Sequence, residues 1–263
     1  MIVKVLMEDS AHSERFRAEH GLSLYIEACG RRILFDAGAS GAFAENAVKM
    51  GVDLTAVEFA VLSHGHYDHG GGLSAFLSLN RNADVYLSRH AFEAQRNASG
   101  KYIGLAPGLA SEPRLICTGD EYRLCEGLEL FSCNERERLF PVDSAGLTMT
   151  ADGKTGPDDF RHEQYLLINE KGRRILVSGC SHKNVLNLLE WFRPDVMIGG
   201  FHFMKISTTG AGKDLLDTAA RQMMRHKTVF YTCHCTGAAQ YEYLKKIMKE
   251  QLNYLSCGQT VEL

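Results

Sequence analysis

The first half of the chain alternates short apolar runs with segments of helical periodicity. Apolar residues that alternate with polar ones, or run unbroken over a few positions, predict strands, whereas apolar residues on one helical face predict helices. Strands are therefore expected at residues 2–6, 22–28, 32–35, 59–62 and 84–87, and helices at residues 42–50, 73–79 and 90–96. Such a sequence of elements is typical of a layered α/β protein.

The second half repeats this order of strands and helices after a less regular middle. Residues 99–113 are expected to form a loop, residues 114–150 several short strands, and the polar residues 151–159 a mobile loop. Strands are then expected at residues 165–169, 174–178, 195–198 and 228–232, and helices at residues 184–192, 213–225 and 238–249. Two such halves predict two mixed sheets packed face to face with helices outside, in one α/β domain spanning residues 1–263.

Composition narrows the class of protein. A chain of 263 residues with 45% hydrophobic residues can fill the core of one domain. A net charge of −3 gives no reason to expect nucleic acid or an anionic membrane as a partner. The eight cysteines lack the spacing of a disulfide framework, so reduced thiols are expected. No apolar run is long enough to span a membrane or resembles a secretion signal, so we expect a cytoplasmic location, while the oligomeric state stays open.

The segment at residues 63–72, directly after a predicted strand, carries several potential metal ligands close together. His64 and His66 point the same way if the segment is extended, and Asp68 and His69 follow where three glycines allow a sharp turn. Imidazole nitrogens and a carboxylate oxygen are ligands of zinc, manganese and iron. The segment therefore predicts a metal site, and the alternative of a surface loop with a capping aspartate needs far fewer of these residues.

Further ligands are expected at the ends of later strands. Cys180 and His182 follow an apolar strand and share a face if extended, so either could be the ligand from the middle of the chain. His234 also follows a strand and is the best candidate for the final ligand. His202 ends an apolar strand and is expected to contact metal or substrate.

Other candidate residues are assigned structural roles. Cys233 and Cys235 flank His234, should point away from it, and are interpreted as packing residues. Asp36 is expected to orient a histidine ligand by a hydrogen bond. Surface or packing positions are expected for His12, His20, His90 and His226.

The HxHxDH pattern of residues 64–69 resembles that of the metallo-β-lactamase superfamily. Over nearly its whole length the chain is similar to the branch that contains 7,8-dihydropterin-6-methyl-4-(β-D-ribofuranosyl)aminobenzene-5′-phosphate synthase. The matching segments are residues 19–23, 34–38, 63–72, 179–182, 199–202 and 234–237.

This resemblance implies a four-layer αββα sandwich with a metal cleft at one edge. It implies that His64 and His66 bind one metal ion, that Asp68 and His69 bind a second, and that His182 and His234 are further ligands. His162 precedes a strand where the superfamily often has a histidine ligand, so it is an alternative to His182 and Cys180 as the ligand from the middle of the chain. It also implies that Asp68 orients the attacking hydroxide. One or two divalent ions are expected, zinc first, with manganese or iron as alternatives.

The predicted function is that of a metal-dependent hydrolase, or a hydrolase-like transferase, that uses a metal-bound hydroxide. Its substrate is expected to be small and anionic. Lys183 and Lys205 lie beside proposed site residues and favour a phosphorylated substrate, whereas a pterin-related substrate is what the resemblance implies. Asp68 is the predicted catalytic residue, with His202 or Lys183 contacting the anionic group. Either lysine could instead be a solvated surface charge.

Two other classes of function fit the same residues. The chain could be a non-enzymatic binder that keeps the metal pocket for a small molecule. It could also be a di-iron redox protein, although no segment resembles the flavin domain that usually supplies electrons to such a centre.

Overall fold

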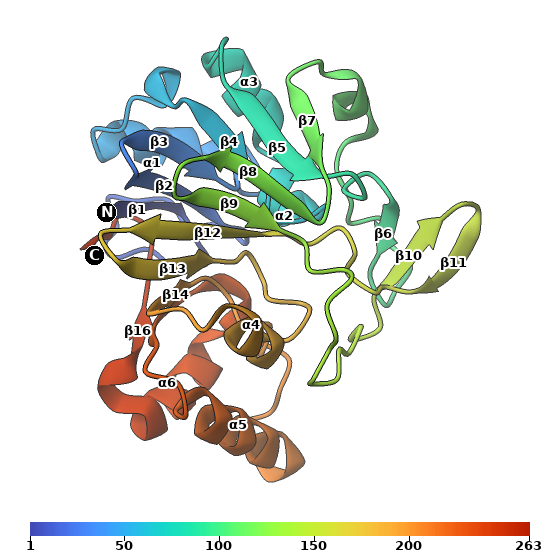
Figure 1. Cartoon of the computed structure of the whole chain (residues 1–263), viewed down its shortest axis with the longest axis vertical. Coiled ribbons are helices and arrows are strands. Elements are labelled where there is room, and N and C mark those ends of the chain that lie inside the picture. The colour runs from blue at the N-terminus through green and yellow to red at the C-terminus, as the bar shows by residue number, and fades with distance from the viewer.

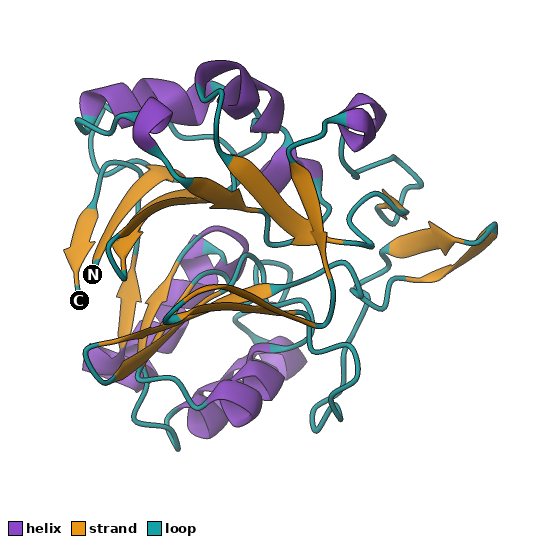
Figure 2. Cartoon of the chain, turned by 45° about the horizontal axis from the view of Figure 1, so that its top comes forward, coloured by secondary structure: helices purple, strands orange, loops and turns teal.

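Two seven-stranded β-sheets face each other, and helices cover both outer faces (Figures 1 and 2). This computed structural model describes residues 1–263. The four layers confirm the αββα arrangement expected from the resemblance, including the mixed character of both sheets. No helix is both long and apolar enough to cross a bilayer.

The first sheet is antiparallel on one side and parallel on the other. In spatial order its strands are β17 (Thr260–Glu262), β1 (Ile2–Met7), β2 (Ser23–Ala28), β3 (Arg31–Phe35), β4 (Phe59–Val61), β5 (Asp84–Ser88) and β7 (Leu115–Thr118). β3, β4, β5 and β7 are parallel, so the segments that follow them begin at one edge of the sheet. The histidine-rich segment follows β4.

The second sheet has a similar division. Its strands, in spatial order, are β16 (Leu252–Tyr254), β15 (Val229–Thr232), β14 (Val196–Ile198), β13 (Arg173–Val177), β12 (Tyr165–Glu170), β9 (Leu128–Phe131) and β8 (Glu121–Cys125). β13, β14 and β15 are parallel neighbours, so their carboxyl ends share one edge. Cys180, His202 and His234 follow these three strands and are thereby brought to the same edge.

Three apolar cores hold the layers together. The inner core packs Ile33 and Phe35 of the first sheet against Leu166 and Val177 of the second. A second core joins the first sheet to the helices α1 (Ala42–Lys49) and α3 (Leu73–Leu79). The third joins the second sheet to α4 (Val185–Phe192), α5 (Gly210–Met223) and α6 (Ala238–Met248). The remaining helical turns are α2 (Tyr67–Gly70), η1 (Leu54–Ala56), η2 (Pro107–Ser111), η3 (His234–Thr236) and η4 (Lys249–Gln251).

Two local predictions are wrong. Residues 90–96 form a turn followed by strand β6 (Ala94–Arg96) instead of a helix, because β6 pairs with β10 (Thr148–Ala151). Residues 151–159 contain strand β11 (Lys154–Pro157), which pairs with β10 in a hairpin that projects from the body (Figure 1). The hairpin turns at Asp152 and Gly153, both with positive φ, and Asp-Gly is a strong hairpin signal.

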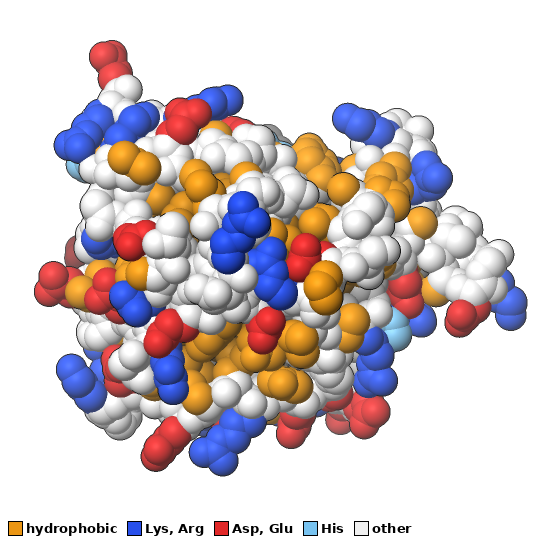
Figure 3. Space-filling model, turned by 90° about the horizontal axis from the view of Figure 1, so that it is seen from above, with side chains coloured by type: hydrophobic (Ala, Val, Ile, Leu, Met, Phe, Trp, Pro, Cys, Tyr) orange, Lys and Arg blue, Asp and Glu red, His pale blue; other side chains and the backbone are white.

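The surface carries charges of both signs, and the two ends of the chain lie together. Seen from the end of the molecule at which α3 lies, acidic and basic side chains are interspersed with apolar ones (Figure 3). The two termini are adjacent, because β1 pairs with β17 and the Met1 amino group lies 3.2 Å from the Leu263 carbonyl oxygen.

Candidate metal centre

The segment after β4 places its histidines by close contact with neighbouring backbone. A Cβ atom on Gly65 would lie 2.3 Å from the Ala91 carbonyl oxygen, and one on Gly72 would lie 2.1 Å from the Ala37 carbonyl oxygen. Only glycine fits where backbones approach this closely. His66 is extended and α2 starts directly after it, so Asp68 and His69 lie on one helical turn.

His64, His66 and His182 form the first group of candidate ligands. Their ring centroids are 4.6 to 5.1 Å apart, and all three side chains are buried. Nε2 of His64, Nε2 of His66 and both ring nitrogens of His182 have no hydrogen-bond partner. Because buried polar atoms are nearly always satisfied, three converging imidazoles with free nitrogens fit a metal ion.

The surroundings keep these rings neutral and fixed in orientation. Burial lowers the pKa of His66 to about 3 and holds the pKa of His64 and of His182 well below the ordinary value. The Ser63 hydroxyl lies 2.8 Å from His64 Nδ1, and Phe160 stacks on His182 at 4.5 Å between centroids. Neutral imidazole is the form that binds metal.

Asp68, His69 and His234 form a second group. His69 Nε2 lies 3.2 Å from His234 Nε2 and 3.7 Å from Asp68 Oδ2, and the third side of this triangle is 3.4 Å. Two ligands about 2.1 Å from one tetrahedral ion are about 3.4 Å apart. Cys180 Sγ lies 3.3 Å from His69 Nε2, at the border of this group.

Carboxylates anchor the two histidines of the second group from behind. Asp36 Oδ2 lies 2.7 Å from His69 Nδ1, the contact expected if Asp36 orients a histidine ligand, and Asp9 Oδ1 lies 2.6 Å from His234 Nδ1. Such carboxylate–histidine pairs direct Nε2 toward a metal. Burial raises the pKa of Asp68, but the neighbouring imidazoles of His69 and His234 outweigh it, so the pKa lies below the ordinary value and the carboxylate is ionised.

A sequence model described as the metallo-beta-lactamase superfamily matches residues 17–217. The chain belongs to this superfamily. It is 26% identical over 266 residues to the uncharacterized protein MJ0448 of Methanocaldococcus jannaschii, with 98% of this chain and 97% of that protein covered. It is 24% identical over 289 residues to 7,8-dihydropterin-6-methyl-4-(beta-D-ribofuranosyl)-aminobenzene-5'-phosphate synthase of the same organism, with 99% of this chain and 96% of that protein covered. The chain is also similar to the crystal structure of Tm1679, a metal-dependent hydrolase of the β-lactamase superfamily, with 26% identity and a TM-score of 0.85. The alignment covers 100% of this chain and 99% of the Tm1679 chain.

Within this superfamily fold, His162 is not placed as a free ligand. Its Nδ1 accepts a hydrogen bond from the Gly65 backbone N–H at 3.1 Å, so its Nε2 carries the proton and donates to Asp158 Oδ2 at 3.1 Å. Both ring nitrogens are therefore engaged in holding the histidine-rich segment. Of the three candidates from the middle of the chain, the structure presents the free nitrogens of His182 and the thiol of Cys180.

Lys183 also departs from its prediction as a substrate contact. Its side chain is fully buried, and Nζ donates to the carbonyl oxygens of Ser132 at 2.6 Å and Glu163 at 3.0 Å. Burial lowers the pKa of Lys183 to about 8. The ammonium group thus ties the start of α4 to the second sheet and does not line the cavity beside the histidines.

Two adjoining cavities open beside the histidine groups. One of about 170 Å³ is lined by His66, Asp68 and His234, and one of about 300 Å³ lies next to it. Both share His182, His202 and Lys205. Burial and the charge of Lys205 lower the pKa of His202 to about 4, so a neutral imidazole and an ammonium group face the space beside the candidate ligands.

His20 was predicted at a surface or packing position and Asp9 was given no role, yet both lie beside the candidate ligands. The His20 ring nitrogens lie 2.8 Å from Asp9 and 3.5 Å from Asp68, and Asp9 also lies 2.6 Å from His234. Cys235 was predicted to point away from His234, but its thiol lies within 4.8 Å of a ring nitrogen of His234 and 3.6 Å from the Cys180 carbonyl oxygen. A signal for His20 was the glycine that follows it. A Cβ atom on Gly21 would lie 2.4 Å from the Asp68 carbonyl oxygen, so this glycine marks a contact with the histidine-rich segment.

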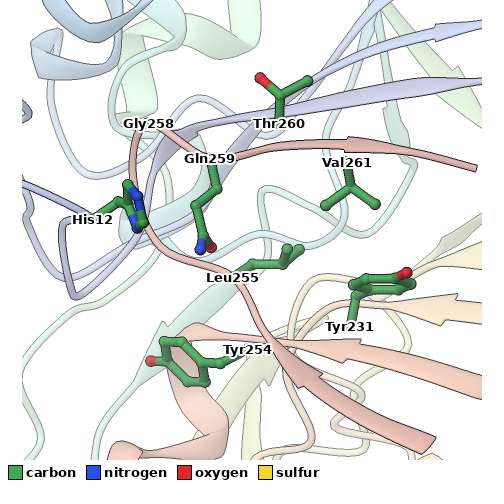
Figure 4. A pocket seen from close by; sticks show the side chains of 8 residues that line it. All are labelled: His12, Tyr231, Tyr254, Leu255, Gly258, Gln259, Thr260 and Val261. Carbon is green, nitrogen blue, oxygen red and sulfur yellow. The ribbon is translucent and has the colours of Figure 1, made fainter. Parts of the chain in front are cut away.

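A separate cavity of about 350 Å³ lies where the edge strands of the two sheets diverge (Figure 4). Tyr231, Leu255 and Val261 give it apolar walls, and His12 is its one histidine. His12 is exposed, as predicted for a surface residue. The Tyr254 hydroxyl donates to Glu8, which also accepts the His234 backbone N–H, so this cavity reaches the candidate centre only through its supporting residues.

Proposed function

We propose that this protein is a metal-dependent hydrolase that acts on a small anionic substrate, with phosphate esters as the favoured class. The observation that carries the proposal is the pair of adjoining ligand groups, of which the first consists of buried imidazoles with unpartnered nitrogens. The likeness to Tm1679 over the whole chain supports hydrolysis as the type of reaction.

We assign His64, His66 and His182 to one divalent ion, and Asp68, His69 and His234 to a second. Cys180 borders the second group and could join it. Imidazole and thiol donors favour zinc, while the carboxylate also suits manganese or iron. When bound, a divalent ion supplies Lewis acidity and lowers the pKa of water, which is the chemistry that hydrolysis needs.

The side chains around the proposed ions can orient the nucleophile and bind the anionic substrate. Asp68 is ionised and lines the smaller cavity, so its carboxylate can accept a hydrogen bond from a nucleophile and orient it there. Neutral His202 can donate a hydrogen bond to an anionic oxygen, and the exposed Lys205 attracts that anion to the opening. The compound in the name of the 24%-identical synthase carries a 5'-phosphate, and these two residues would contact a phosphate of this kind.

The test combines metal analysis with turnover. Purified protein is analysed for metal content and screened against a phosphodiester, a phosphomonoester, a lactone and a thioester. We expect about two metal ions per chain and hydrolysis of a phosphate ester. Asp68→Asn should reduce kcat by about 10²- to 10⁴-fold.

His90→Ala is the matched control, since His90 pairs with Glu93 away from the candidate ligands and should leave turnover unchanged. Metal binding without turnover of any compound would instead indicate a small-molecule binder. Protein that binds no metal under any condition would overturn the proposal.

A further inference from the structure

His20 has a defined position at the edge of the second ligand group. Its Nδ1 lies 2.8 Å from Asp9 Oδ2 and its Nε2 lies 3.5 Å from Asp68 Oδ2, while its ring centroid is 4.8 Å from that of His234. The side chain is 46% exposed and lines the smaller cavity. One nitrogen is therefore anchored and the other faces the proposed metal position.

The same arrangement occurs in both histidines already assigned to this position. In His69 and His234, Nδ1 contacts a carboxylate and Nε2 faces Asp68. Asp9 serves two of the three rings, because Oδ1 contacts His234 and Oδ2 contacts His20. Three Nε2 atoms thus lie 3.4 to 3.7 Å from Asp68 Oδ2, which is longer than a good hydrogen bond and close to the spacing of ligands around one ion.

The backbone before β2 holds His20 in this place. The Leu22 N–H donates to the Asp68 carbonyl oxygen at 3.1 Å, and the Gly21 N–H donates to Asp9 Oδ1 at 3.4 Å. Gly21 has φ of +152° and leaves no room for a Cβ atom against Asp68. The segment that carries His20 is therefore built against the histidine-rich turn.

We propose that His20 is a further metal ligand, which binds the second ion through Nε2 together with Asp68, His69 and His234. This inference rests on the proposed metal centre. With four protein ligands the second position would be closed, whereas His64, His66 and His182 leave the first position open for water and substrate. The two positions would then differ in role, the second holding its ion permanently and the first carrying the reaction.

The test measures metal binding, independent of turnover. Wild type and His20→Ala are loaded with Co²⁺ or Zn²⁺, and stoichiometry, affinity and the visible spectrum of bound Co²⁺ are recorded. We expect the variant to keep one ion in the first position and to bind the second at least about 10- to 100-fold more weakly, with a changed spectrum. His90→Ala, which removes another carboxylate-paired histidine, should behave as wild type.

The outcomes separate this inference from the proposed function. Wild type that binds no metal overturns both. Suppose that wild type binds two ions. If His20→Ala then binds both with unchanged affinity and spectrum, or if the folded variant loses both together, only the proposed role of His20 is overturned. Wild type that binds one ion also overturns the role of His20 and leaves the proposed function standing. Should the variant not fold, a crystal structure of zinc-loaded wild type decides: His20 Nε2 at about 2.1 Å from zinc supports ligation, and a distance beyond about 3 Å excludes it.

Discussion

His64, His66 and His182 show at the residue scale what this fold is built to hold. Each buries a ring nitrogen without a hydrogen-bond partner, and an unsatisfied buried polar atom costs about 1–3 kcal/mol. Three such atoms in one place are tolerated because a ligand can satisfy them together. Exposure alone does not identify the functional residues, since His20 is partly exposed whereas Lys183 is fully buried and structural.

Lys183 and Lys205 give a matched test of this distinction. Lys183→Met should lower the free energy of unfolding by about 1–3 kcal/mol, because the Ser132 and Glu163 carbonyl oxygens lose their donor, with little change in KM. Lys205→Met should leave stability unchanged and raise KM for a phosphate ester roughly tenfold. Urea denaturation and steady-state kinetics on both variants measure these effects, and the reverse pattern would exchange the two roles.

The element scale explains why the candidate ligands meet. Most candidate ligands follow strand β4 of the first sheet or strands β13 and β15 of the second, and His20 precedes strand β2. Each of these strands is anchored in the inner core, while the turns at their ends are free to carry polar side chains. The turn after β4 depends on glycine because it passes between other backbone segments.

Gly72→Ala tests that dependence. The added methyl group would meet the carbonyl oxygens of Ala37 and Ser40, so the free energy of unfolding should fall by about 1–3 kcal/mol and bound metal should decrease. Gly156→Ala is the control, because a Cβ atom there meets nothing within 4 Å. Denaturant titration and elemental analysis compare the two, and equal effects would show that the turn is not tightly packed.

At the scale of the whole molecule, three cores keep ionisable thiols away from water. Cys133 and Cys257 are both fully buried, and burial raises the pKa of each from 9.0 to about 12. A free thiol in the unfolded chain loses its proton near 9.0, whereas these two keep theirs in the native state. Their contribution to stability is therefore complete below pH 9 and is lost as pH rises toward 12.

Alkaline unfolding measures this contribution. The free energy of unfolding should decrease as the pH rises from about 9 toward about 12, because the unfolded chain holds fewer protons than the native one in this range. Cys133→Ala should make the decrease shallower, while Cys117→Ala, at an exposed position, should follow wild type. An identical pH slope in Cys133→Ala would remove the buried Cys133 thiol as a cause.

The region of the site and most of the secondary structure could be predicted from the sequence alone. The pattern at residues 63–72 and the strand ends before Cys180, His202 and His234 predicted the region of the site, and local periodicity predicted most strands and helices. The repeated order of strands and helices, together with the resemblance, predicted the layer arrangement. The helix expected at residues 90–96 failed because pairing with β10 outweighed a short local periodicity.

The sequence by itself determined the donor chemistry and the strand-end positions, since residue type and apolar periodicity are local properties. Only the tertiary structure decided which nitrogens are free. It engaged both ring nitrogens of His162, buried the ammonium group of Lys183, and brought His20 and Asp9 to His234 across more than 200 residues of chain. Such choices depend on contacts between distant segments, and side-chain orientation and hydrogen-bond partners are set only once the sheets have packed.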